Sequence, residues 1–119
     1  MSWLAPADAL DLIPVAHDRL RDLVDTIYAA DIHRDTLDLV RRRIGSLIAG
    51  RPMALDNDLT DTQQAALTFA EQYVLDVRGF TDANDVMLHS YFTDAQLTTL
   101  TFAVAVFDAV ARTNAVLGA

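Results

Sequence analysis

Glu71 and His89 are the two side chains of this sequence that are best suited to acid–base chemistry. Glu71 follows the apolar Ala70, and a carboxyl that is partly removed from water has a raised pKa. His89 lies between apolar neighbours in the stretch MLHSYF, where an imidazole titrates near neutrality. A positioned acid and an anion-stabilising group could protonate a carbanion or enolate after loss of CO₂. The competing interpretation is a Glu that makes a structural hydrogen bond between helices and a half-exposed packing His.

The basic cluster of the chain is Arg41, Arg42 and Arg43. Consecutive residues of a helix point about 100° apart, so these three guanidinium groups do not form one flat patch. Asp38 and Arg42 have the i,i+4 spacing of a helical ion pair, and Arg41 or Arg43 could neutralise a carboxylate in the core. An anion-binding role for one of these arginines is the alternative to a purely structural one.

The composition excludes several kinds of chemistry. The chain has no Cys, which rules out disulfides, thiolate metal sites and thiol nucleophiles, and no Lys, which rules out Schiff-base catalysis. His17 and His33 lie in polar surroundings and are expected to be solvated, and no two His have the i,i+4 spacing of a metal site. We therefore expect no metal and no cofactor.

Length and charge indicate one acidic globular domain. A chain of 119 residues has the size of a single domain, which we place at residues 1–119. Its net charge of −8 and pI near 4.5 argue against binding to nucleic acid or to an anionic membrane surface. The N-terminus has no basic region before an apolar run, and the run Phe102 to Val106 is too short to cross a bilayer. The prediction is a soluble cytoplasmic protein.

Apolar residues at three- and four-residue steps predict an all-α bundle of five to six helices. Thr60 with Gln63 and Thr93 with Gln96 fit the capping box, and Thr81 is a further N-cap. No strand-like alternation of useful length is present. The expected helices cover residues of about 15–31, 35–49, 61–77, 82–91 and 94–117, with Gly50 and Pro52 ending the second.

One apolar stripe from each helix is expected to form the core. The inward positions of the first three helices are Leu20, Leu23, Val24, Ile27 and Tyr28; Leu37, Val40, Ile44, Leu47 and Ile48; and Ala66, Ala70, Tyr73, Val74 and Val77. The last helix is apolar almost all round, which predicts burial on several sides. Trp3 and Leu4 add an apolar pair ahead of the first helix. Because one subunit of this size would have difficulty covering that last helix, we expect a homo-oligomer.

Two runs of the sequence carry a resemblance to a known family. They are IPVAHDRLRDLVDTIYAADIHRDTLDLVRRRIGSLIAG and LTDTQQAALTFAEQYVLDVRGFTDANDVMLHSYFTDAQLTTLTFAVAVFDAVARTNAVLG. The runs resemble the two halves of the carboxymuconolactone decarboxylase and alkylhydroperoxidase D-like superfamily, and together they cover nearly the whole chain. The resemblance implies an alkylhydroperoxidase D-like helical fold and assembly into a trimer or hexamer, or a dimer.

The resemblance also implies where the reactive groups of the family would lie. Catalytic members carry a Glu in a stretch like ELVRLRVSQLNGC, followed by a C-x-x-C pair and a His. In this chain Asp38 stands at the Glu position, Gly50 and Met53 at the two Cys positions, and Asn57 near the His position. A C-x-x-C peroxidase needs one thiolate to attack the peroxide and a second thiol to resolve the sulfenic acid. Since neither thiol is present, thiol peroxidase activity is not expected.

These residues leave two hypotheses for the function. The first is an oligomeric small-ligand-binding or interaction module without peroxidase activity. The alternative is a carboxymuconolactone decarboxylase-like lyase or isomerase that uses Glu71, His89 and Asp38 on a small carboxylated substrate. A helical segment that precedes the LT motif in the family is absent here, so the short connector 51–59 is expected to close the ancestral site. An open polar cavity lined by all three residues would contradict that expectation.

Overall fold

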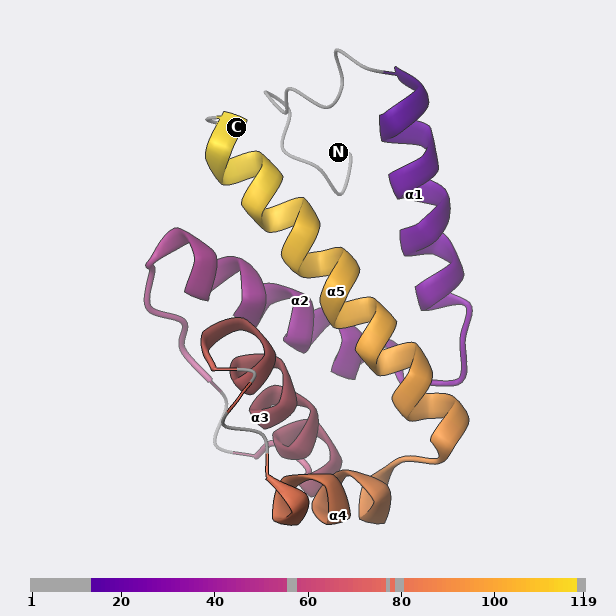
Figure 1. Cartoon of the computed structure of the whole chain (residues 1–119), viewed down its shortest axis with the longest axis vertical. Coiled ribbons are helices and arrows are strands. Elements are labelled where there is room, and N and C mark those ends of the chain that lie inside the picture. Colours follow the sequence, from indigo (N-terminus) through magenta and orange to yellow (C-terminus); the bar gives the residue numbers. More distant parts are fainter. Residues whose placement is uncertain (1–13, 56–57, 77, 79–80, 118–119) are drawn as a thin grey trace.

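The computed structural model describes residues 14–55, 58–76, 78 and 81–117, and within these ranges it contains five helices and no strand. The helices are α1 (Pro14–Tyr28), α2 (Arg34–Ala49), α3 (Asp61–Leu75), α4 (Asp82–Tyr91) and α5 (Asp94–Leu117), as Figure 1 shows. The predicted all-α fold is confirmed. The largest boundary difference is at the end of α1, which stops three residues before the predicted Asp31 because the chain turns there to bury Ile32.

Three helices begin at threonine caps, as predicted. Thr60 with Gln63 and Thr93 with Gln96 form capping boxes. In each, the backbone N–H of the Gln donates to the Thr hydroxyl, and the backbone N–H of the Thr donates to the side-chain oxygen of the Gln. The donor–acceptor distances are 2.9 to 3.1 Å. Thr81 caps α4 with the same reciprocal geometry. These contacts supply partners to amides that have none within the helix, so they define where α3, α4 and α5 start.

Local contacts also close α2 at both ends. At its start the Nδ1 of His33 accepts a hydrogen bond from the Asp35 amide at 3.2 Å, so this exposed His also caps a helix. At its end Gly50 adopts φ 67° and ψ 28°, the left-handed conformation that favours Gly. The Gly50 and Arg51 amides then donate to carbonyls of the last turn of α2, at 3.3 and 2.9 Å. The predicted helix stop at Gly50 is confirmed.

The bundle is organised around α2 and α5. α2 packs against α3 and α5, and α5 packs against all four other helices. Figure 1 shows α5 crossing in front of α2, with α4 at one end of the bundle next to α3. Burial of apolar side chains along these contacts is the main stabilising contribution, at about 25 cal/mol per Å² removed from water. The largest fully buried side chains are Ile27, Leu37, Val40, Ile44, Leu67, Leu100 and Val104.

The predicted inward positions are correct with one exception among the described residues. Leu23 was expected in the core but is 39% exposed, whereas its neighbours Val24 and Ile27 are buried. α1 packs chiefly against a single helix, α5, so only a narrow stripe of its surface is covered. Trp3, Leu4 and Val77 lie outside the described residues.

α5 is the one helix of the described ranges that is long and apolar enough to cross a bilayer, judged by length and composition alone. Its most apolar window has a mean hydropathy of 1.2, and 33% of that window is buried inside the bundle. The expectation from the sequence considered only the short run Phe102 to Val106 and missed this length. Contact with the four other helices accounts for the part of this apolar surface that is buried.

The buried Leu100 and the exposed Leu75 allow a matched test of the core. Leu100 is 0% exposed and Leu75 is 66% exposed. Leu100→Ala should lower the free energy of unfolding by about 2–5 kcal/mol, because it removes buried methyl groups and leaves a cavity. Leu75→Ala should change it by about 0.5 kcal/mol or less, as surface substitutions do. Urea unfolding followed by circular dichroism at one fixed protein concentration measures both; equal effects would contradict the packing described here.

Candidate functional site

The three site residues predicted from the sequence lie on three helices, and each has its own partner. Asp38 on α2 accepts a hydrogen bond from the Tyr28 hydroxyl at 2.7 Å. Glu71 on α3 and His89 on α4 are engaged separately, as described below. No hydrogen bond or ion pair joins any two of the three in the described ranges. The structure therefore does not bring Asp38, Glu71 and His89 together, and none of the three hollows described below is lined by all of them.

Glu71 forms an ion pair with Arg43 that links α3 to α2. The Arg43 Nη2 donates to Glu71 Oε2 at 2.8 Å, and the two side chains are only 21% and 34% exposed. The prediction that Arg41 or Arg43 neutralises a carboxylate is confirmed for Arg43. A carboxylate that already accepts a hydrogen bond from a guanidinium across a helix interface suits a structural contact more than a general acid.

Asp38 is occupied by a contact between α1 and α2. Burial first, and then the hydrogen bond to Asp38, raise the pKa of the Tyr28 phenol, so this hydroxyl remains a donor at neutral pH. The guanidinium of Arg34 lies 4.9 Å from the centre of the Tyr28 ring and covers it. The predicted pair of Asp38 with Arg42 is wrong: Arg42 is exposed, and the buried end of Tyr28 takes its place beside Asp38.

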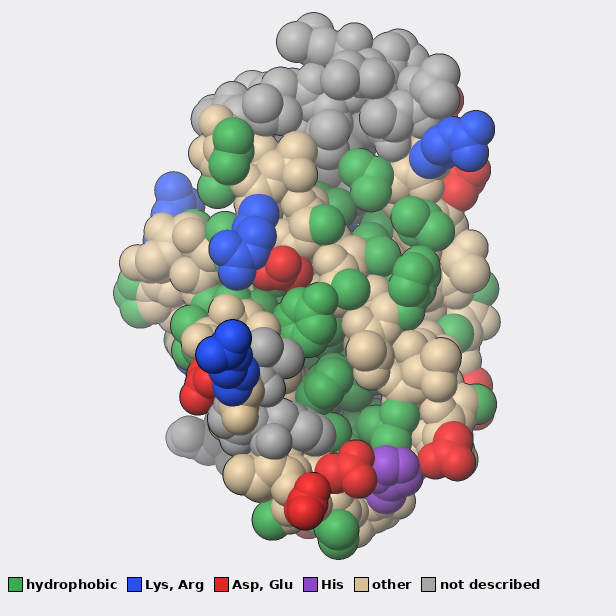
Figure 2. Space-filling model, in the orientation of Figure 1, with side chains coloured by type: hydrophobic (Ala, Val, Ile, Leu, Met, Phe, Trp, Pro, Cys, Tyr) green, Lys and Arg blue, Asp and Glu red, His purple; other side chains and the backbone are tan. Residues whose placement is uncertain are grey.

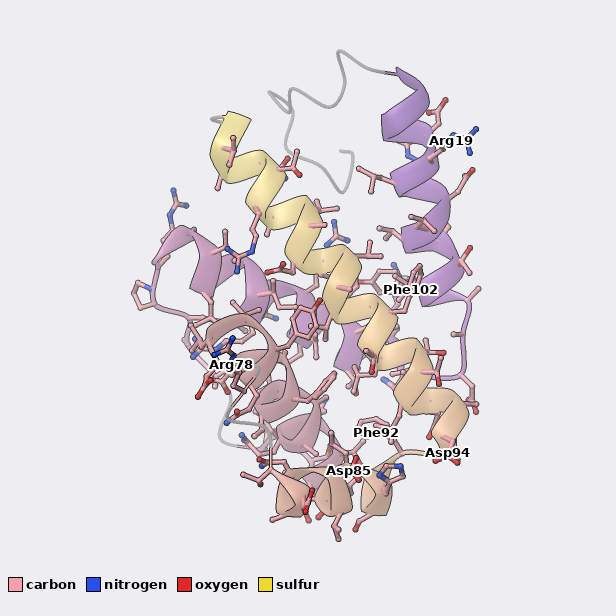
Figure 3. The ribbon with its side chains drawn as sticks, viewed as in Figure 1. Arg19, Arg78, Asp85, Phe92, Asp94 and Phe102 are labelled. Atoms are coloured by element: carbon pink, nitrogen blue, oxygen red, sulfur yellow. The ribbon has the colours of Figure 1, made fainter. Side chains whose placement is uncertain are left out.

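His89 lies between two carboxylates where α4 meets α5. Its Nδ1 is 2.9 Å from the Asp85 carbonyl and 3.5 Å from the Asp85 carboxylate, and its Nε2 is 3.3 Å from the Asp94 carboxylate. Figure 3 shows Asp85 on α4 and Asp94 at the start of α5. The hydrogen bond to the Asp85 carbonyl, supported by both negative charges, raises the pKa of His89. This favours the imidazolium form, in which both ring nitrogens donate.

An apolar hollow of about 730 Å³ adjoins this histidine. We call it the α4–α5 hollow; its edge carries His89, Asp85 and Asp94. Figure 2 shows hydrophobic side chains along α5 and, below them, a histidine between acidic groups. The apolar residues that line it are Phe69, Leu88, Leu97, Phe102 and Ala105.

Phe102 separates the α4–α5 hollow from a smaller one. Its side chain is 43% exposed although it is a large aromatic residue. It also borders a hollow of about 190 Å³ between α5 and α1, which includes Ile27 and Ala30. Figure 3 shows Phe102 on the side of α5 that faces α1. The sequence signal for this surface was the all-round apolar composition of α5, which indicated an interface without saying which residue stands out from it.

A third hollow, of about 300 Å³, lies between α1, α2 and α5 and shares no lining residue with the other two. We call it the α1–α2–α5 cavity. Its polar lining consists of Arg41, Arg51 and Asn114. Sequence reasoning missed Arg51 and Asn114 as site residues. A mid-helix glycine, Gly45, also lines this cavity and was the one signal in the sequence that could have pointed to it.

The positions implied by the family resemblance form no catalytic group among the described residues. Gly50 is the C-cap of α2, and Met53 is a half-buried residue of the connector. Asn57 and the His17 side chain lie outside the described residues. Within the described part of the chain, no three or more His, Asp or Glu side chains gather in a way that could hold a metal ion.

The raised pKa of His89 can be measured directly. We expect its imidazole to titrate above 6.5 in an NMR pH titration of the folded protein, and Asp94→Asn to move the midpoint downward by removing one negative charge. Because the folded-state pKa is the higher one, His89 stabilises the fold fully below pH 6.5, and this contribution disappears as the pH rises through its folded pKa. The stability difference between the wild type and His89→Gln should shrink accordingly; a difference that grows with pH would refute the assignment.

Comparison of the sequence with models of protein families and with characterised proteins gives no match.

Proposed function

We propose that this protein is a homo-oligomeric interaction module without thiol peroxidase activity, and that its copies associate through the outward face of α5. By this face we mean Leu97, Thr98, Thr101, Phe102 and Ala105. The observation that carries the proposal is an exposed Phe102 beside an apolar hollow. Exposed apolar surface beside a hollow is a feature of interaction surfaces.

The arrangement suits association with a second copy because it contains both a projection and a recess. In a two-fold interface the same patch is used by both partners, so a protruding side chain of one copy must meet a recess of the other. Phe102 supplies the projection, and the α4–α5 hollow supplies the recess. Buried aromatic anchors contribute much of the binding energy of protein interfaces. The imidazolium of His89 lessens the repulsion between the acidic edges that two copies would bring together.

The proposed relationship is to the alkylhydroperoxidase D-like superfamily. It is supported by the two sequence runs given above and by a helical bundle that contains every helix expected from them. Thiol peroxidase chemistry has no place in this proposal, because the chain has no cysteine to attack a peroxide or to resolve a sulfenic acid. A dimer is the assembly that this two-fold contact forms by itself, and a trimer or hexamer would need a second interface. The proposal places the protein in the cytoplasm, in line with its acidic composition.

The enzymatic alternative has less support. A lyase or isomerase would hold its acid and base around one pocket. Glu71 is engaged by Arg43 and does not line the α4–α5 hollow, whereas His89 does. A substrate in that hollow would therefore meet the imidazole without the carboxyl of Glu71.

Substitutions on the α5 face test the proposed association. Phe102→Asp places a charge at the centre of the interface and should raise the dissociation constant of the oligomer by about a hundredfold or more. Thr101→Arg should act similarly by filling the recess, and it replaces an exposed residue that lines the hollow. Native mass spectrometry and sedimentation velocity over a range of protein concentrations measure the effect.

The matched control is Val116→Asp, which adds the same charge to the same helix at a residue that is 83% exposed and lies outside the hollow. It should leave the oligomer unchanged. Circular dichroism establishes that each variant is folded. A wild-type chain that is monomeric at all concentrations, or an oligomer that Phe102→Asp and Thr101→Arg both leave intact, would overturn the proposal.

A further inference from the structure

The α1–α2–α5 cavity has the size and lining of a site for a small organic molecule. Its volume is about 300 Å³. At roughly 30 Å³ for each water-sized group, this is room for about ten such groups. Val24, Phe107 and Val110 form apolar walls, and none of them is more than 7% exposed. Apolar walls with a few convergent polar groups are typical of small-molecule sites.

Gly45 widens the cavity on the α2 side. A Cβ placed on Gly45 would meet no described atom within 4 Å, so close packing does not require glycine there. Its backbone does not require glycine either, because Gly50 is the one described glycine with a positive φ. Glycine in the interior of a helix is less stable than alanine. What Gly45 provides in return is empty space in the cavity wall.

Two arginines make the cavity suitable for an anion. The Arg41 guanidinium lies 5.7 Å from the centre of the Phe107 ring and also interacts with the Tyr28 hydroxyl, so it is not a free cation. Arg51 follows the end of α2, and both arginines line the cavity. Among the described residues that line it there is no Asp or Glu. In a chain with a net charge of −8, this is a local concentration of positive charge. The planar guanidinium group binds carboxylates through paired hydrogen bonds.

The partial negative charges of the helix ends near the cavity are smaller than the positive charges of these two arginines. Ala49 and Ala115 also line it, so it lies near the carboxyl ends of α2 and α5. Each helix end carries a partial negative charge of about half an elementary charge, which opposes an anion. The full positive charges of Arg41 and Arg51 exceed that amount.

Asn114 adds a requirement for a hydrogen-bond donor. Its Oδ1 atom is buried and has no hydrogen-bond partner among the described residues. The residue lines the cavity. Leaving a buried acceptor without a donor is costly, and such atoms are rare in folded proteins. A hydroxyl or N–H group of a bound molecule would supply the missing donor once the Asn114 side chain turns this oxygen, now covered by protein atoms, toward the cavity.

From these observations we infer that the α1–α2–α5 cavity binds a small organic carboxylate that has an apolar body and a hydrogen-bond donor. Arg41 and Arg51 receive the carboxylate, the apolar walls receive the body, and the Asn114 oxygen accepts from the donor. The inference does not depend on the proposed association, because the cavity and the α5 face share no residue. Ligand binding and oligomer formation therefore succeed or fail separately.

The test uses three related probes with the full chain. 4-Hydroxyphenylacetate has the carboxylate, the apolar body and the donor; 4-hydroxyphenylacetamide lacks the charge, and phenylacetate lacks the donor. In NMR titrations of the ¹⁵N-labelled protein, 4-hydroxyphenylacetate should bind saturably and shift the Gly45 amide signal. Each of the other two probes should bind about tenfold more weakly or worse, since a hydrogen bond to a charged or buried group is lost.

Variants then locate the binding. Gly45→Leu fills the cavity and should abolish binding, whereas Gly45→Ala adds one methyl group and should weaken it less. Arg51→Ala, at an exposed position that does not threaten folding, should weaken carboxylate binding by about tenfold. Ala109→Leu, on an exposed part of α5 outside the cavity, is the control and should bind as the wild type does.

Two results would overturn the inference. One is the absence of saturable binding of 4-hydroxyphenylacetate at millimolar concentration. The other is binding that Gly45→Leu and Arg51→Ala both leave unchanged, which would place the probe elsewhere on the protein. If Gly45→Leu does not fold, the result with Arg51→Ala alone decides between the two.

Discussion

The burial of α2 against α3 and α5 is the constraint on which the rest of this structure depends. Leu37, Val40 and Ile44 of α2 are completely buried, so these apolar residues of the helix lie in the core. Consecutive residues of a helix point about 100° apart, so the polar residues between them leave the helix in different directions. The partly buried ones among them therefore contact different neighbouring helices, which is what the structure shows.

The polar contacts of α2 follow from this geometry. Asp38 reaches Tyr28 of α1, Arg43 reaches Glu71 of α3, and Arg41 covers the ring of Phe107 of α5. The residues that looked most able to do chemistry are thus the ones that fix α2 to its neighbours. Partly buried charges are costly unless they are paired, so the pairing takes precedence over any free reactive group. The hollows of the molecule lie where α2 and α5 carry small side chains, such as Gly45 and Ala115.

The sequence predicts those parts of the fold that depend on contacts between neighbours along the chain. The capping boxes of Thr60 and Thr93 and the left-handed Gly50 are local, and each was correctly located. The pair of Asp38 with Arg42 failed because a tertiary partner, Tyr28, displaced a local one.

The candidate sites were harder to predict for the same reason. Glu71 and His89 could be recognised as titratable groups, but the partner of Glu71 comes from α2, and one of the two carboxylates beside His89 comes from the start of α5. The partner of a side chain on another helix depends on the angle at which the helices cross, and periodicity in one helix carries no information about that angle. The unpartnered oxygen of Asn114 and the space beside Gly45 exist only once three helices have been placed together.

Part of the apolar surface of α5 is used inside the bundle. This helix contacts four others, so side chains on several of its faces, such as Leu100, Val104 and Phe107, are buried. The charged side chains of α5 are either exposed or paired. Asp94 is 93% exposed beside His89, and Asp108 forms an ion pair with Arg112 at 2.9 Å. One apolar strip remains uncovered, and Phe102 is its largest member. A helix that packs against four neighbours inside one subunit has little freedom to be polar on its remaining face, and in the association that we propose this face is removed from water by a second copy of the chain.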